Sequence, residues 1–233
     1  MLHLDFNNLK LDRVLIELRF QDTFKIGLPE VRFKLLEKFT RKYSMYDNNN
    51  TEALGFYNPE KQMQLEIRLN RCLITWDQPN NLPEFLKSAK GDFSFLLSQL
   101  DINVLHRVGV RTFNSYEAQN QQVIDQFIFK EYLAPGVCSP NFADEYFSPR
   151  VQMSGKKKGI LFNLAISHQQ EQVIQGKVNE IVNSKIHDTL VIDLDSYKEN
   201  IKVSKLEPFL NDVRNLNEDS INYLQTFKQG IMI

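Results

Sequence analysis

Several features that would define a secreted or membrane protein are missing from this sequence. The 233 residues include only two cysteines, Cys72 and Cys138, and neither belongs to a Cys-x-x-Cys pair. This count excludes the disulfide framework of a small secreted domain and favours free thiols in a reducing compartment. No stretch approaches the roughly 18 consecutive apolar residues of a membrane helix, and Met1–Asp5 lacks the basic and apolar regions of a signal peptide. We therefore predict a cytoplasmic protein with no membrane partner.

The sequence also lacks the short motifs that mark common catalytic and cofactor sites. It contains no phosphate-binding loop, no dinucleotide fingerprint, no His-Glu-x-x-His and no Gly-x-Ser-x-Gly. His106 and His168 are candidate general bases, but a lone histidine in a strand is more often a packed residue than a catalyst. No cofactor is predicted. The balance favours a non-enzymatic role, and the question of enzymatic activity stays open.

What the sequence does contain is a set of short strands that carry charges on one face. Apolar and ionisable residues alternate in Leu15–Phe20, Leu65–Leu69, Val108–Phe113 and Val191–Asp195. Because side chains alternate across a strand, each segment places its charges on one face and its aliphatic residues on the other. If these strands share a sheet, they form one charged surface opposite the core, made of Arg13, Glu17, Arg19, Glu66, Arg68, Arg107, Arg111, Asp193 and Asp195.

Periodicity along the chain predicts an α+β fold. The first half reads as strand, helix, three strands, helix, strand, with the helices following Pro29 and Pro83. In the second half, 124–132 fits either a helix or a strand, and 173–181 fits a strand. Arg150–Met153 and Ile160–His168 form the arms of a hairpin, and a terminal helix starts near Ser204.

The predicted architecture is a mixed, mostly antiparallel sheet with helices packed on one face. Two related halves, 1–115 and 116–233, remain open as a domain organisation.

Two ligand chemistries fit the charged face. Arginine binds phosphate or carboxylate through a bidentate fork, so the candidate anion contacts are Arg19, Arg68, Arg107 and Arg111. Carboxylates hold divalent metals, so the weaker metal candidates are Glu17, Glu66, Asp193 and Asp195. The plainer alternative is that these acids and arginines pair across neighbouring strands and stabilise the sheet, each pair by roughly 0.2–1 kcal/mol.

A second candidate site is the basic run Lys156–Lys158 at the expected hairpin tip. The formal net charge of the chain is −1, so no bulk attraction to nucleic acid is implied. The lysines could still contact phosphates, with the nearby aromatic residues Phe142, Tyr146 and Phe147 stacking on bases. An exposed turn without any partner is the commoner role of such a run.

Four landmarks in fixed order carry a family resemblance. They are Glu17–Phe20, Arg107–Asn114, Leu190–Tyr197 and Asn217–Ile221. Together they resemble a prokaryotic family of sporadically distributed proteins of unknown function, although Thr112-Phe113-Asn114 departs from the family's usual Tyr-aliphatic-Asn. The resemblance implies no catalytic residue. Its patchy distribution implies cargo of mobile elements or phage-defence islands.

From these features we predict a non-enzymatic cytoplasmic binding or interaction module. Its charged sheet face would recognise a partner protein or an anionic ligand, and a homo-oligomer is the alternative to a protein partner. The apolar end of the sequence, Ile231–Ile233, is a further candidate partner contact. The alternatives are a metal-dependent enzyme acting on a phosphate-containing substrate and a nucleic-acid-binding protein that uses Lys156–Lys158.

Overall fold

The computed structural model describes residues 8–133, 147–177 and 180–226, and it confirms the α+β prediction. Cys138, Phe142, Tyr146 and 231–233 lie outside the described residues. One nine-stranded sheet, in the order β2-β3-β4-β5-β1-β6-β9-β8-β7, forms the centre of this part of the protein. Its strands are β1 (Lys10–Arg19), β2 (Met45–Asp47), β3 (Ala53–Asn58), β4 (Met63–Arg68), β5 (Arg71–Asp77), β6 (Val104–Ala118), β7 (Arg150–Lys157), β8 (Ile160–Lys177) and β9 (Glu180–Lys202).

Every described strand pairing in this sheet is antiparallel. The sheet is continuous between the two sequence halves, because β6 pairs with β1 on one side and with β9 on the other. The boundary drawn at residue 115 therefore falls inside β6.

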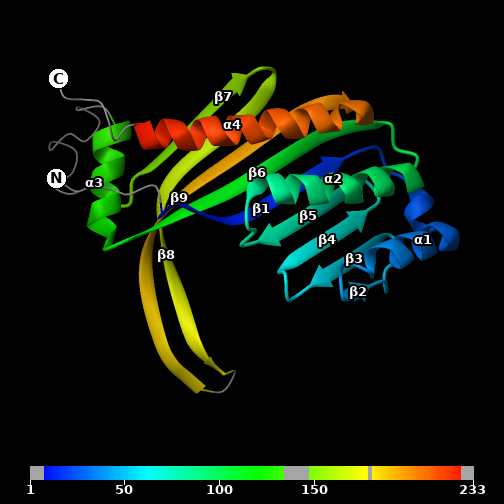
Figure 1. Cartoon of the computed structure of the whole chain (residues 1–233), viewed down its shortest axis with the longest axis horizontal. Helices are drawn as coiled ribbons and strands as arrows, with labels where there is room; N and C mark the ends of the chain where they lie inside the picture. The colour runs from blue at the N-terminus through cyan, green and yellow to red at the C-terminus, as the bar shows by residue number, and fades with distance from the viewer. Residues whose placement is uncertain (1–7, 134–146, 178–179, 227–233) are drawn as a thin grey trace.

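Four α-helices lie against one face of the sheet (Figure 1). α1 (Pro29–Phe39) and α2 (Leu82–Gln99) each carry a proline at the start, where its missing N–H costs little. α3 (Gln121–Tyr132) settles the ambiguity over 124–132 in favour of a helix, because Asn120 caps its first turn by accepting from the N–H of Val123 at 3.2 Å. α4 (Leu206–Thr226) starts two residues later than predicted. Among the described helices, none is both long and apolar enough to cross a membrane.

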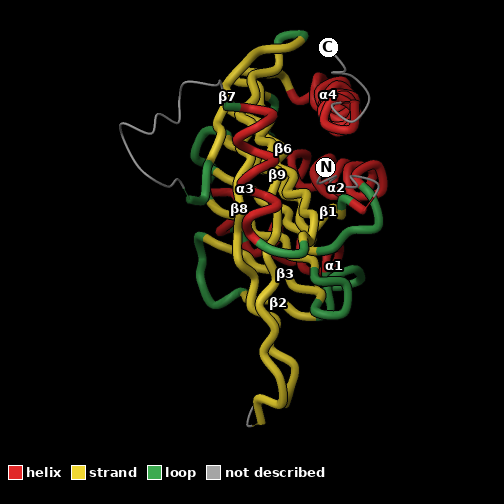
Figure 2. The backbone as a smooth tube through the Cα atoms, turned by 90° about the vertical axis from the view of Figure 1, so that its left-hand side faces the viewer, coloured by secondary structure: helices red, strands yellow, loops and turns green. Residues whose placement is uncertain are grey.

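The apolar residues form two separate clusters beneath these helices. The larger cluster joins the inward face of β1, with Val14, Ile16 and Leu18 fully buried, to α1, α2 and the first half of α4. The smaller cluster lies under α3, where Ile124 and Ile128 pack on β8 and β9. The opposite face of the sheet has no described helix over it, as the edge-on view shows (Figure 2).

Two hairpins extend the second half. β7 and β8 pair through a two-residue turn at Lys158 and Gly159, whose φ angles of 50° and 77° fit a type I′ turn. The predicted loop of 154–159 was too long, because Ser154–Lys157 continue β7. β8 and β9 run on past the end of β6 as a two-stranded arm that projects from the sheet (Figure 1).

Candidate functional site

The predicted charged residues share the face of the sheet that no described helix covers. On β1, Glu17 and Arg19 alternate with the buried Ile16 and Leu18, so they point away from the core. The strand register then aligns their neighbours. Arg19 lies opposite Arg71 on one side and Arg107 on the other, and Arg71 lies opposite Arg68. Four arginines therefore form one cross-strand row near the end of the open face, which we call the arginine row.

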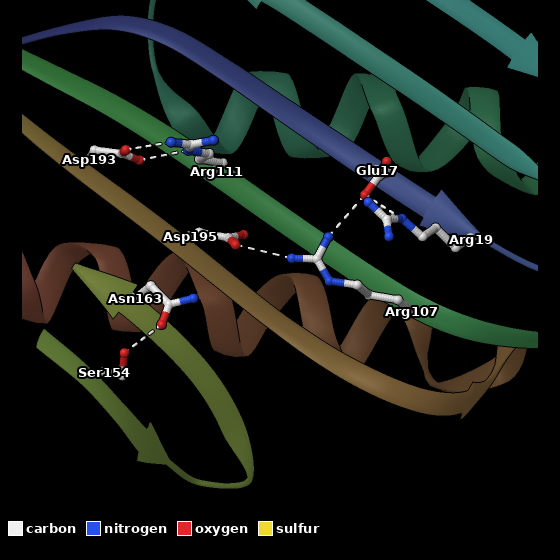
Figure 3. A network of polar contacts seen from close by, with 8 residues as sticks. All are labelled: Glu17, Arg19, Arg107, Arg111, Ser154, Asn163, Asp193 and Asp195. Atoms are coloured by element: carbon white, nitrogen blue, oxygen red, sulfur yellow. Dashed lines mark hydrogen bonds and ion pairs between the residues drawn. The ribbon is translucent and has the colours of Figure 1, made fainter. Parts of the chain in front are cut away.

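Glu17 is the centre of an ion-pair network beside this row (Figure 3). Its carboxylate accepts from Arg19 Nε at 2.8 Å and from Arg107 Nη1 at 2.9 Å, and it lies 3.8 Å from Arg71 Nη1. The Glu17 side chain is only 12% exposed. Arg107 extends the network to β9 by donating from Nη2 to Asp195 at 3.0 Å, and it stacks over the ring of Tyr197. One partly buried carboxylate thus orients two guanidinium groups by hydrogen bonds and forms an ion pair with a third.

A second pair, Arg111 and Asp193, lies further along the same face. Arg111 donates from Nε and Nη2 to the two carboxylate oxygens of Asp193 at 2.7 and 2.6 Å, the bidentate geometry that Arg favours. This hydrogen bonding raises the pKa of Arg111. Burial raises the pKa of Asp195, whereas Arg107 and Arg111 oppose that rise. These pairs realise the cross-strand ladder that the sequence left as the plainer alternative.

Arg71 is a member of the site that sequence reasoning missed. The pair Asn70-Arg71 between two predicted strands is typical of a turn, so the sequence gives no reason to place Arg71 on a strand face. In the structure it is the first residue of β5 and donates to Glu66 at 3.3 Å. Arg68 also donates from its Nε to Glu66. The available signal was the short distance in sequence from Arg68 to Arg71, which places both at the end of one hairpin.

The four carboxylates predicted as metal ligands are each engaged by an arginine. Glu17, Glu66, Asp193 and Asp195 all form ion pairs with guanidinium groups. In the described part of the chain, no group of three or more His, Cys, Asp or Glu residues could hold a metal ion. The arrangement therefore offers cationic contacts to a ligand rather than free carboxylates.

A surface cavity of about 550 Å³ opens at the arginine row. It is lined by Arg19, Arg68, Arg71 and His106, together with Phe20 and Asn70, and we call it the arginine cavity. Arg19 and Arg68 each use Nε to contact a carboxylate, and within the described residues their Nη atoms have no hydrogen-bond partner. Their side chains are 54% and 57% exposed. The carboxylates thus hold the inner edge of each guanidinium and leave its outer edge available to an anion.

The lysine run lies elsewhere, at the β7 edge of the sheet. Lys157 donates to Asp219 on α4 at 2.7 Å, and this hydrogen bond lowers the pKa of Asp219. Lys158 occupies the turn itself. Phe147, one of the aromatic residues predicted to stack on bases, is 71% exposed. The arginine row spans β4, β5, β1 and β6, whereas the lysine run begins on the edge strand β7, three strands beyond β6.

The described cysteine is buried, and two of the three described histidines contact carboxylates. Cys72 is fully buried, and burial raises the pKa of its thiol, which keeps it protonated. His168 has a side chain only 6% exposed and donates from Nε2 to Asp188 at 2.8 Å. His187 contacts Glu117. His106 is the one of these histidines that lines the arginine cavity.

The pair of His168 and Asp188 gives a pH-dependent prediction. The hydrogen bond from His168 lowers the pKa of Asp188 below its ordinary value of 3.8, and bonds from Gln170 and the backbone of Gln121 act in the same direction. A carboxyl group whose pKa is lowered by folding stabilises the fold above its unfolded pKa, and this stabilisation is lost as the pH falls through the folded-state pKa.

We therefore expect Asp188→Asn to unfold at lower urea concentration than the natural chain at neutral pH. The difference in unfolding free energy should shrink as the pH falls below 3.8, the ordinary pKa of Asp188. Urea titrations across a pH series measure this difference. A difference that stayed constant through the acid range would show that the Asp188 carboxylate contributes no linked stability.

Comparisons with known proteins place the chain in no family. No protein-family profile matches the sequence, and no curated protein matches it. Among solved structures, the TBP of Methanococcus jannaschii matches with 11% sequence identity and a TM-score of 0.31, over 93% of this chain and 99% of that chain. A likeness at that TM-score carries no inference about function. The resemblance to a sporadically distributed prokaryotic family stays a prediction.

Proposed function

We propose that the protein is a non-enzymatic binding module whose open charged face recognises an anionic group on a partner protein or ligand. The arginine cavity is the contact point in this proposal. The anion is an oxyanion, phosphate or carboxylate, because these are the groups whose geometry matches the guanidinium fork. On sequence grounds we place this role in the cytoplasm, and the family resemblance suggests a mobile-element or phage-defence context.

One observation carries the proposal, namely the arginine row itself. Like charges directly opposite one another across strands are unfavourable. The four neighbouring strands β4, β5, β1 and β6 nevertheless place four arginines in successive opposite positions, namely Arg68, Arg71, Arg19 and Arg107. Three carboxylates pair with these four guanidinium groups, namely Glu17, Glu66 and Asp195, so they offset only part of this charge. An oxyanion in the cavity would offset the rest.

The carboxylates also keep the guanidinium groups in place before a ligand arrives. Glu17 and Glu66 have side chains 12% and 20% exposed, so they are anchored in the sheet surface. Arginines held by such anchors lose less side-chain freedom on binding than free arginines do, which favours affinity. His106, at the rim of the same cavity, adds a further donor to an oxyanion.

The other two functions predicted from sequence have less support. A metal-dependent enzyme needs unengaged carboxylates, whereas Glu17, Glu66, Asp193 and Asp195 are all paired with arginines. Nucleic-acid binding through Lys156–Lys158 would use a short turn in which Lys157 is already paired with Asp219. Both remain predictions.

The double substitution Arg19→Gln and Arg68→Gln tests the proposal. We expect inorganic phosphate to raise the melting temperature of the natural chain at constant ionic strength, because a ligand that binds only the folded state stabilises it. The double variant should lose at least about tenfold in apparent phosphate affinity, equivalent to roughly 1.4 kcal/mol. Differential scanning fluorimetry with phosphate against chloride measures this.

Arg13→Gln is the matched control. Arg13 lies on the same open face, is 54% exposed like Arg19, and pairs with Asp77 outside the arginine cavity. This variant should keep the full response to phosphate. Equal loss in the control and the double variant would show a general charge effect, and an unchanged response in the double variant would refute the proposal.

A further inference from the structure

A second cavity, of about 710 Å³, lies on the helix-covered face near the lysine run. It opens between the β7–β8 hairpin, the end of α3 and the second half of α4. Its apolar lining comes from Phe162 and Leu164 on β8, Met153 on β7 and Leu216 on α4. Figure 2 shows α4 standing off from the β7 end of the sheet, next to these strands. This volume is in the range of small-molecule sites.

The cavity exists because the two hydrophobic clusters do not merge. Leu216 belongs to the large cluster and Phe162 packs against it. Leu164 and Tyr132 pack against the small cluster under α3. Apolar side chains that pack with both clusters therefore line the same cavity. Met153, on the edge strand β7, is 40% exposed at the edge of the cavity. An apolar molecule bound in the cavity would cover these side chains and remove their apolar surface from contact with water.

One member of the lysine run, Lys157, lies at the rim of this cavity, and the proposed function does not use it. Lys157 and Asp219 both line the cavity and are paired at 2.7 Å, with side chains 47% and 56% exposed. Lys158 follows at the turn and acts on Asp219 as well. Lys157 and Asp219 balance each other among the lining residues, and the positive charge of Lys158 beside them is the excess at this rim. An anionic end group therefore complements the rim, and an apolar chain complements the floor.

We propose that this cavity binds a single-chain amphiphile with a carboxylate end, of the fatty-acid type. The chain lies against Phe162, Leu164 and Leu216, and the carboxylate takes Lys157 from Asp219. This site is independent of the arginine cavity, so either proposal can fail alone.

A chain-length series tests the apolar half of the site. Isothermal titration calorimetry with hexanoate, octanoate and decanoate, each below its micellar concentration, should show affinity rising about fourfold per added methylene group. Met153→Trp should weaken decanoate binding at least tenfold, because the indole occupies the cavity. Gln152→Trp is the matched control, since Gln152 is the neighbouring exposed residue on the opposite face of β7. It should bind decanoate as the natural chain does.

Charge variants test the rim and do not depend on repacking. Asp219→Asn frees Lys157 and should tighten decanoate binding severalfold, whereas Lys157→Gln should weaken it. Lys156→Gln, on the opposite face of the same strand, should have no effect. Decylamine, which is cationic, should bind more weakly than decanoate. The proposal is overturned by affinity that ignores chain length, by equal binding of decylamine, or by binding that appears only when decanoate is presented in lipid vesicles.

Discussion

Glu17→Gln should lower the free energy of unfolding by about 3 kcal/mol, the cost of breaking a largely buried ion pair by removing one partner. Glu17 contacts Arg19 and Arg107 at 2.8 and 2.9 Å and lies close to Arg71. Its removal leaves guanidinium groups opposite one another without the carboxylate that separates them. Urea denaturation followed by circular dichroism measures the change.

Glu52→Gln is the control for this variant. Glu52 is an exposed loop acid, and within the described residues its side chain forms no ion pair. Its substitution should change the unfolding free energy by less than about 0.5 kcal/mol. If Glu17→Gln lowered the unfolding free energy as little as Glu52→Gln, the network would be a set of exposed pairs with no structural role. Glu17 would then not anchor the arginine row.

Asp92→Asn should also destabilise the fold strongly, by about 2–4 kcal/mol, because it leaves a partly buried lysine without its counter-ion. Asp92 is 7% exposed on α2 and pairs with Lys42, whose Nζ also donates to Ser88 at 2.6 Å. Tyr43 donates its hydroxyl to the same carboxylate at 3.3 Å. Burial, then Asp92, raises the pKa of the Tyr43 phenol, so it stays protonated as a donor.

The exposed pair of Lys25 and Asp101 provides the comparison for Asp92. It has the same two residue types, but the side chains are 43% and 68% exposed. Asp101→Asn should therefore cost less than about 1 kcal/mol. Urea midpoints of the two variants, measured side by side, separate the effect of burial from that of pairing. Equal losses would contradict the assignment of Asp92 as a buried anchor between α2 and the turn that follows α1.

The open charged face could be predicted from sequence because it depends on a local property. Alternation in Leu15–Phe20 and Val108–Phe113 sets which side chains point away from the core, and any sheet that pairs these strands gathers them on one surface. The pairing of Glu17 with Arg107 could not be predicted, because it depends on the register between β1 and β6. Gly109 contributes to it, since a Cβ there would lie 3.3 Å from the Arg107 guanidinium carbon.

The parts of the site that sequence reasoning missed depend on longer-range packing. Arg71 follows Asn70 in a segment whose sequence is typical of a turn, and this turn is what brings Arg71 beside Arg68. The apolar cavity at Phe162 and Leu216 arises from the separation of two clusters, which no single segment encodes. The helix at 121–132 was within reach, because Asn120 has the residue type and position of an N-cap.

Binding of an oxyanion at the arginine row can be observed at the arginine side chains themselves. We would titrate isotopically labelled protein with inorganic phosphate and follow the Nε–Hε resonances of its arginines by NMR. We expect saturable shifts at Arg19, Arg68 and Arg71, which line the cavity, and none at Arg111, whose guanidinium is already held by Asp193. Small unsaturable shifts spread over all exposed arginines would contradict binding at this row.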